Sequence, residues 1–157
     1  SQMGPLISEE HRNHVHSLVE SGIRDGAEVL SGGKLCDGEG YFYEPTVLAS
    51  VRSEMAVVQE EIFGPVVTAM PFDDPDEVAA LANDTPYGLA GSIWTRDVSK
   101  AHHMAARIRA GLLWINCHGI PDMAVPFGGF KQSGWERENG WEGLEKYTEL
   151  KSVLTLL

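Results

Sequence analysis

The sequence has few basic residues and no long apolar run. Its 157 residues include 12 Lys and Arg against 23 Asp and Glu, which gives a formal net charge of -11. Nucleic-acid binding depends on clustered Lys and Arg that neutralise phosphates, so this balance excludes nucleic acid as the main ligand. No apolar run approaches the roughly 20 residues that cross a bilayer, so we do not expect membrane insertion.

Cysteine is also scarce. The two thiols, Cys36 and Cys117, show no metal-ligand spacing, and a chain of this size needs no disulfide to be stable. No signal peptide is recognisable at the start, so we expect free thiols in a cytoplasmic protein. The sequence begins at Ser1 without a Met and leads directly into a helix start, so we expect a piece of a longer chain.

The length and the 43% hydrophobic content predict one α/β domain. Helices are predicted to begin after the capping residues Ser8, Asp74 and Asp97. Strands are predicted at residues 27–33, 41–48, 65–72, 89–95 and 112–116. The alternation of strands and helices from residue 65 onward indicates crossover units on a largely parallel sheet.

A glycine-rich loop, residues 117–131, follows the last of these strands. Ligands of parallel sheets gather at the carboxyl ends of the strands, so this loop is a candidate lining for a small apolar ligand. The alternative is a surface loop that buries its own Phe and Met side chains.

Three histidines on the first helix, His11, His14 and His16, invite a metal hypothesis. Only His11 and His14 share a face, and no carboxylate or Cys completes a ligand set. We therefore interpret them as solvated helix surface and predict no metal site.

Two adjacent carboxylates, Glu60 and Glu61, precede an aromatic residue, Phe63, and a Gly-Pro turn that opens an apolar strand. Folding alone gives little reason for charge at this place. The alternative is that both are ordinary solvated turn residues.

The end of the chain combines a short helix or turn, residues 143–150, with an apolar strand, residues 151–157. A free apolar edge would promote aggregation, so we expect this strand to add to a sheet, quite possibly in another subunit.

Taken in order, several short motifs resemble the carboxy-terminal third of an NAD(P)-dependent aldehyde dehydrogenase. The motifs are Met3-Gly4-Pro5-Leu6-Ile7-Ser8, Gly32-Gly33, Glu44-Pro45-Thr46-Val47, Glu60-Glu61-Ile62-Phe63-Gly64-Pro65-Val66, residues 83–89, Trp94-Thr95, residues 111–116, Pro126-Phe127-Gly128-Gly129-Phe130-Lys131 with Ser133-Gly134, and Tyr147-Thr148-Glu149. The resemblance implies that residues 1–149 are the carboxy-terminal part of the catalytic domain and residues 150–157 an oligomerisation strand. It also implies NAD or NADP as cofactor, a small-molecule aldehyde as substrate, and a homodimer or homotetramer.

The resemblance further implies roles for individual residues. Glu61 would accept hydrogen bonds from the nicotinamide ribose hydroxyls, Phe63 would pack beside the nicotinamide ring, and Leu89 would lie near the same ring. His118, Ile120 and Phe127 would line the tunnel through which the aldehyde enters.

In this family a cysteine thiolate attacks the aldehyde, and a glutamate activates the water that hydrolyses the thioester. The cysteine motif is not in this sequence, so the resemblance places both groups upstream of Ser1 and leaves no catalytic residue here. Cys117 does not replace the nucleophile, and we expect the chain alone to be inactive. His118 and Pro121 replace residues that are often aromatic, which leaves the substrate class open.

Two other interpretations remain at this stage. The chain is a non-catalytic structural or assembly module that reuses the fold, or it is part of a related dehydrogenase that acts on an acyl semialdehyde.

Overall fold

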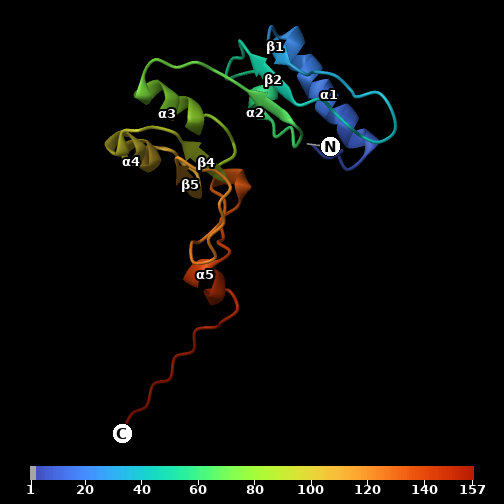
Figure 1. Ribbon diagram of the computed structural model, residues 1–157. Helices are drawn as coiled ribbons and strands as arrows, with labels where there is room; N and C mark the ends of the chain where they lie inside the picture. Colours follow the sequence, from blue (N-terminus) through green and yellow to red (C-terminus); the bar gives the residue numbers. More distant parts are fainter. Residues whose placement is uncertain (1–2) are drawn as a thin grey trace. The chain divides into compact units, whose positions relative to one another are not determined.

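A computed structural model describes residues 3–157 (Figure 1). The backbone forms two compact units, one up to Asp73 and one from Asp74 onward. Each unit has its own sheet and is described by itself.

The first unit begins with helix α1 (Glu9–Arg24), as the sequence predicts. The Ser8 hydroxyl accepts a hydrogen bond from the backbone N–H of His11 at 3.1 Å, and Glu9 and Glu10 lie in the first turn. Negative charge there complements the positive end of the helix dipole. The helix ends at Arg24, two residues before Gly26, whose φ of 103° is a backbone conformation that favours glycine.

The sheet of the first unit has the order β1 (Glu28–Ser31), β2 (Thr46–Ala49), β3 (Val66–Thr68). Strands β1 and β2 are antiparallel, whereas β2 and β3 are parallel. The second and third strands are shorter than the sequence predicts. A single-turn helix, α2 (Ala56–Gln59), lies between β2 and β3 and was not predicted, because one turn is too short to show a helical period.

Helix α1 packs against this sheet through one apolar face. Val15, Val19 and Leu48 are fully buried, and Val15 and Val19 lie one helical turn apart. The other buried members of this core are Leu18, Ala27, Tyr43, Val51, Met55, Val57 and Ile62. Burial, reinforced by the charges of Glu20 and Glu44, raises the pKa of Tyr43 to about 12.

The second unit contains one parallel crossover, formed by β4 (Ala90–Ile93), α4 (Val98–Arg107) and β5 (Leu112–Ile115). Helix α3 (Pro75–Asn83) precedes it. The predicted caps are confirmed: a carboxylate oxygen of Asp74 accepts from the N–H of Asp76 at 2.9 Å, and one of Asp97 accepts from the N–H of Lys100 at 3.1 Å. A short 3-10 helix (Lys131–Ser133) and helix α5 (Gly140–Glu145) follow.

The prediction of a single, largely parallel sheet is wrong in two respects. Residues 3–157 form two small sheets, and the sheet of the first unit is mixed. Strand β3 pairs with β2 and not with β4, so the strand and helix alternation that begins at residue 65 contains only one crossover inside a sheet. Strands β4 and β5 are only partly buried. In a sheet of two strands each strand has a neighbour on one side only, so neither strand is fully covered.

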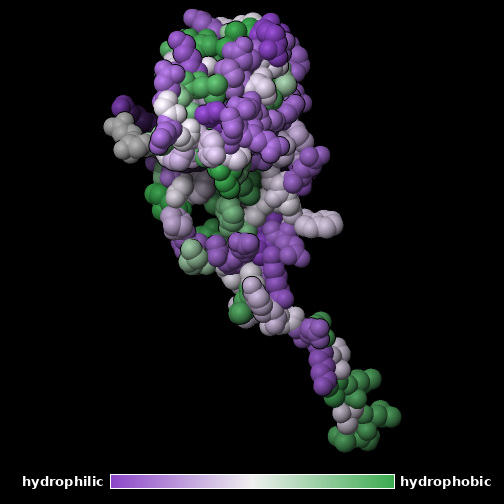
Figure 2. All heavy atoms as spheres, turned by 90° about the vertical axis from the view of Figure 1, so that its right-hand side faces the viewer, coloured by the Kyte–Doolittle hydropathy of each residue, from purple (hydrophilic) through white to green (hydrophobic). Residues whose placement is uncertain are grey.

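The end of the chain forms neither helix nor strand over residues 148–157, and every one of these residues is exposed. The helix predicted at 143–150 is α5, which begins and ends earlier. The tail in Figure 2 ends in a run of hydrophobic residues, which includes Leu154, Leu156 and Leu157. A strand exists only when it is hydrogen-bonded to another, so in the single chain the predicted strand at 151–157 is not formed, and its pairing with a second subunit stays a prediction.

Candidate functional site

The predicted site residues fall into both units. Glu61 and Phe63 belong to the first unit, while Leu89, His118, Ile120 and Phe127 belong to the second. We therefore describe two surfaces separately: the Glu61 turn, residues 60–64, and the β5 loop, residues 117–131.

The Glu61 turn connects α2 to the residues that precede β3. Ile62 is buried in the core, whereas Glu61 is exposed and Phe63 is 77% exposed. The turn is thus anchored by one apolar side chain and presents a carboxylate and an aromatic ring to the outside. A phenylalanine this exposed contributes little to the core of its own unit.

Phe63 has a backbone conformation that is rare for a bulky residue. Its φ is 52°, in the left-handed region, which costs roughly 1–2 kcal/mol for a residue other than glycine. The carbonyl oxygen of Phe63 accepts a hydrogen bond from Nε2 of His11 at 2.8 Å. The two rings also meet edge to face, with centroids 6.1 Å apart. Helix α1 therefore supports the turn at the strained residue.

The carboxylate of Glu61 is available to a ligand. Within the described part of the chain it has no hydrogen-bond or ion-pair partner. Its two oxygens can accept from two adjacent hydroxyl groups, and the exposed ring of Phe63 lies two residues away in the sequence. The roles of Glu61 and Phe63 at a nicotinamide ribose stay a prediction.

Leu89 lies immediately before β4 and is 43% exposed. Its carbonyl oxygen accepts from the N–H of Leu112 at 3.2 Å, at the point where β4 and β5 begin to pair. The β5 loop follows the other end of these parallel strands. The structure therefore places Leu89 and the start of the loop at opposite ends of the small sheet.

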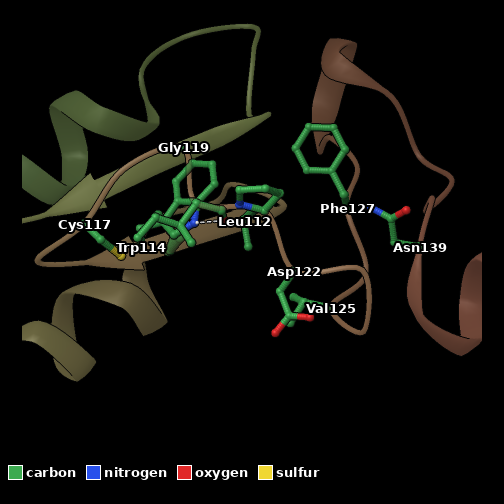
Figure 3. Close-up of a pocket in the computed structure, with 11 residues that line it drawn as sticks. Leu112, Trp114, Cys117, Gly119, Asp122, Val125, Phe127 and Asn139 are labelled. Carbon is green, nitrogen blue, oxygen red and sulfur yellow. Dashed lines mark hydrogen bonds between the residues drawn. The ribbon is translucent and has the colours of Figure 1, made fainter.

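A pocket of about 560 Å³ lies beside β5 and its loop (Figure 3). Ile120 and Phe127 line it together with Trp114 and Cys117, and the role of Ile120 and Phe127 in a substrate tunnel stays a prediction. The other lining residues are Leu112, Leu113, Gly119, Pro121, Asp122, Val125 and Asn139. The lining is predominantly apolar, which suits the carbon chain of a small molecule.

His118 is not among the residues that line this pocket. Its Nδ1 lies 2.6 Å from the hydroxyl of Ser92 on β4, and its ring packs edge to face on Trp114 with centroids 5.1 Å apart. The indole N–H of Trp114 donates to the carbonyl oxygen of Ile120 at 3.1 Å. His118 thus contacts the indole of Trp114, which lines the pocket, but does not line the pocket itself.

Four lining residues are absent from the sequence-based prediction: Leu112, Leu113, Trp114 and Asn139. Trp114 belongs to an apolar strand and carries no sequence signal that distinguishes a lining residue from a core residue. Asn139 joins the pocket because Phe127 and Glu138 exchange two backbone hydrogen bonds, of 2.7 and 2.6 Å. No sequence pattern predicts this backbone pairing between two segments without regular secondary structure.

Cys117 is a free, half-buried thiol at the edge of the pocket. The imidazole that follows it is engaged by Ser92, and no base is bonded to its sulfur among residues 3–157. No group of three or more His, Cys, Asp or Glu that is arranged to hold a metal ion occurs in the same residues. None of the described helices is long and apolar enough to span a bilayer.

Comparison with known proteins identifies the family. Residues 1–153 match the sequence profile described as "Aldehyde dehydrogenase family". The chain belongs to the aldehyde dehydrogenase family. The resemblance inferred from the motifs is therefore confirmed at the level of the family.

Individual aldehyde dehydrogenases show how much of such a protein the chain represents. It is 49% identical over 157 residues to a betaine aldehyde dehydrogenase of Bacillus subtilis, covering 98% of this chain and 32% of that protein. It is 48% identical to the putative aldehyde dehydrogenase DhaS of the same organism, covering 98% and 31%. The chain thus spans about a third of the length of the aldehyde dehydrogenases that it matches.

Solved aldehyde dehydrogenases share the fold. The NAD+ complex of the Bacillus cereus enzyme superposes with a TM-score of 0.94 at 45% identity, over 98% of this chain and 31% of that one. A betaine aldehyde dehydrogenase of Staphylococcus aureus in complex with NAD+ gives a TM-score of 0.89 at 44% identity, over 94% and 30%. The chain is thus homologous to NAD-dependent aldehyde dehydrogenases.

Proposed function

We propose that this chain is the carboxy-terminal part of an enzyme that oxidises an aldehyde to a carboxylic acid with NAD+ or NADP+. It supplies a contact to the nicotinamide ribose and one wall of the substrate pocket. The observation that carries this proposal is the exposure of an unpaired carboxylate and an aromatic ring on the Glu61 turn, whose backbone accepts a hydrogen bond from His11.

Glu61 would bind the cofactor through its ribose. Two carboxylate oxygens match the two neighbouring hydroxyl groups of the nicotinamide ribose, and hydrogen bonds to an ionised acceptor are among the stronger ones. These hydroxyls are the same in NAD and NADP, so Glu61 serves either cofactor. When bound, the cofactor supplies the acceptor for the hydride of the aldehyde.

Phe63 would restrict the position of the nicotinamide ring. A ring that lies against an aromatic wall has fewer orientations, which favours the one in which its reacting carbon faces the substrate. The family resemblance also implies a position near this ring for Leu89, and that role stays a prediction. The related enzymes of Bacillus cereus and Staphylococcus aureus were both crystallised with NAD+, which supports a dinucleotide as the ligand.

The pocket beside β5 would hold the organic part of the aldehyde. Its aromatic and aliphatic lining, from Trp114, Ile120 and Phe127, excludes water from an apolar chain without forming hydrogen bonds to it. His118 would contribute by fixing Trp114 through their edge-to-face contact.

The nucleophilic cysteine and the general base would come from the rest of the protein. Cys117 has no bonded base within the described residues and lies where it lines a wall. We expect the purified 157-residue chain to form no NAD(P)H from any aldehyde, whereas the full-length enzyme does so. Aldehyde-dependent absorbance of NAD(P)H by the chain alone, abolished in Cys117→Ser, would show that Cys117 is the nucleophile.

The exposed apolar tail favours a second role, in assembly with subunits of the same family. Leu154, Leu156 and Leu157 are fully exposed in the single chain. Burying such apolar side chains against another subunit would stabilise an oligomer. We expect removal of residues 150–157 from the full-length protein to lower its oligomeric state, measured by light scattering after size-exclusion chromatography. An unchanged molar mass would rule out the tail as the main contact between subunits.

A further inference from the structure

His11 makes a contact that joins two distant parts of the first unit. Its Nε2 lies 2.8 Å from the carbonyl oxygen of Phe63, 52 residues further along the chain. A carbonyl oxygen can only accept, so Nε2 carries the hydrogen, in the neutral tautomer or in the imidazolium ion. The ring of His11 also meets the ring of Phe63 edge to face.

Two residues on one face of α1 hold the Glu61 turn. Val15 lies one helical turn after His11, so both side chains point the same way. Gly64 packs so closely on Val15 that a Cβ atom at Gly64 would lie 2.8 Å from Cγ2 of the valine. His11 and Val15 therefore contact two consecutive residues, Phe63 and Gly64, immediately after the exposed carboxylate of Glu61.

We propose that His11 is a positioning residue for the cofactor site. It donates a hydrogen bond that holds Phe63 in its left-handed conformation, so that the Phe63 ring and the Glu61 carboxylate are presented together. The inference rests on the proposed role of Glu61 and Phe63 at the nicotinamide ribose, and it adds a residue that itself touches neither substrate nor cofactor.

The backbone strain at Phe63 is the reason why the contact matters. A left-handed φ of 52° at a bulky residue persists only when surrounding contacts favour it over the relaxed conformations. Ile62 is buried in the core, so we expect the loss of the His11 contact to let Phe63 rotate without unfolding the core. The expected consequence is a misplaced aromatic wall in a protein of nearly normal stability.

The test uses three substitutions in the full-length enzyme. In His11→Gln the amide N–H reaches about as far as Nε2 and can donate to the same carbonyl. In His11→Asn the amide is one methylene shorter and falls short of it, and His11→Leu has no donor. The control is His102→Leu, because His102 is exposed on α4 in the other unit and its ring makes no hydrogen bond within the described residues.

Three quantities are measured for each variant: the Kd for the oxidised nicotinamide cofactor by fluorescence titration, the single-turnover rate of NAD(P)H formation, and the Tm. We expect His11→Leu and His11→Asn to raise Kd or to slow the single turnover by roughly five- to tenfold, in line with the loss of one hydrogen bond. We expect His11→Gln and His102→Leu to stay within about twofold of the wild type. The Tm of all soluble variants should change little.

The outcomes separate this inference from the proposed function when Glu61→Gln is measured alongside. If Glu61→Gln impairs cofactor binding or hydride transfer and His11→Asn does not, the inference on His11 is wrong and the proposed function stands. Equal impairment in His11→Gln and His11→Asn would also contradict it, because the ring and not the donor would then matter. If neither Glu61→Gln nor His11→Asn has an effect, both the proposed cofactor contact and the role of His11 fail.

Discussion

Replacing Glu61 by Gln in the full-length enzyme is expected to slow hydride transfer by about ten- to a hundredfold. The amide keeps the shape of the side chain but loses one acceptor oxygen and the negative charge. A hydrogen bond to a charged group contributes roughly 1.5–3 kcal/mol, which corresponds to this range of rates when the bond aligns the reacting ring. Because Glu61 is exposed and unpaired within the described residues, the substitution should leave the Tm unchanged.

The measurement is the rate of NAD(P)H formation in a single turnover, with saturating cofactor and aldehyde. Glu60→Gln is the matched control, since it makes the same chemical change at the neighbouring exposed carboxylate. The family resemblance assigns a cofactor contact to Glu61 and none to Glu60. Equal rates for Glu61→Gln and the wild type, or equal losses for the two variants, would rule out this assignment.

Replacing Gly111 by Ala is expected to have the largest effect on folding. A Cβ atom at this position would collide with the carbonyl oxygen of Gly128 and lie 2.7 Å from its carbonyl carbon. Both neighbours are backbone atoms, which cannot move aside as the end of a flexible side chain can. Overpacking of this kind costs about 3 kcal/mol or more, and here it separates the start of β5 from the segment that carries Phe127.

The effect is measured as the yield of soluble full-length enzyme and its Tm. Gly4→Ala provides the control, because a Cβ at Gly4 has no atom within 4 Å and its φ is not positive. We expect Gly111→Ala to lower the Tm markedly or to abolish soluble expression, and Gly4→Ala to do neither. A Gly111→Ala enzyme with normal Tm and activity would show that this backbone contact is not needed for the fold.

Features that depend on a few neighbouring residues were predicted well from the sequence. Ser8, Asp74 and Asp97 each accept a hydrogen bond from a backbone N–H within the next three residues, so the signal for the helix start is local. The crossover from β4 to β5 was also predicted, because the two strands and the helix between them are consecutive in the sequence.

Features that join distant segments were not predicted. The sequence indicates where strands occur along the chain but not which strands pair with each other. Strand β3 pairs with β2 instead of extending the sheet of β4. The left-handed conformation of Phe63 could not be predicted from the sequence, because this conformation is usual for glycine and asparagine and rare for phenylalanine. The hydrogen bond from His11 that supports it joins residues more than fifty positions apart.

The same long-range contact changes the interpretation of the first helix. The sequence led us to interpret His11 as solvated surface, because no carboxylate or Cys completes a metal-ligand set with the histidines of this helix. In the structure its ring spans the distance from α1 to the Phe63 carbonyl. The family and the candidate cofactor residues were inferred from motifs, whereas the hydrogen bond between His11 and Phe63 could be found only in the structure.

The close packing of the Glu61 turn on α1 has a mechanical consequence. Phe63 and Gly64 are attached to His11 and Val15, two side chains on the same rigid helical turn. A shift of α1 would therefore move the backbone of Phe63 and Gly64 with it, and Glu61 precedes this backbone by two residues. If the proposed cofactor contacts are correct, a single helix sets the position of the backbone that carries both of them.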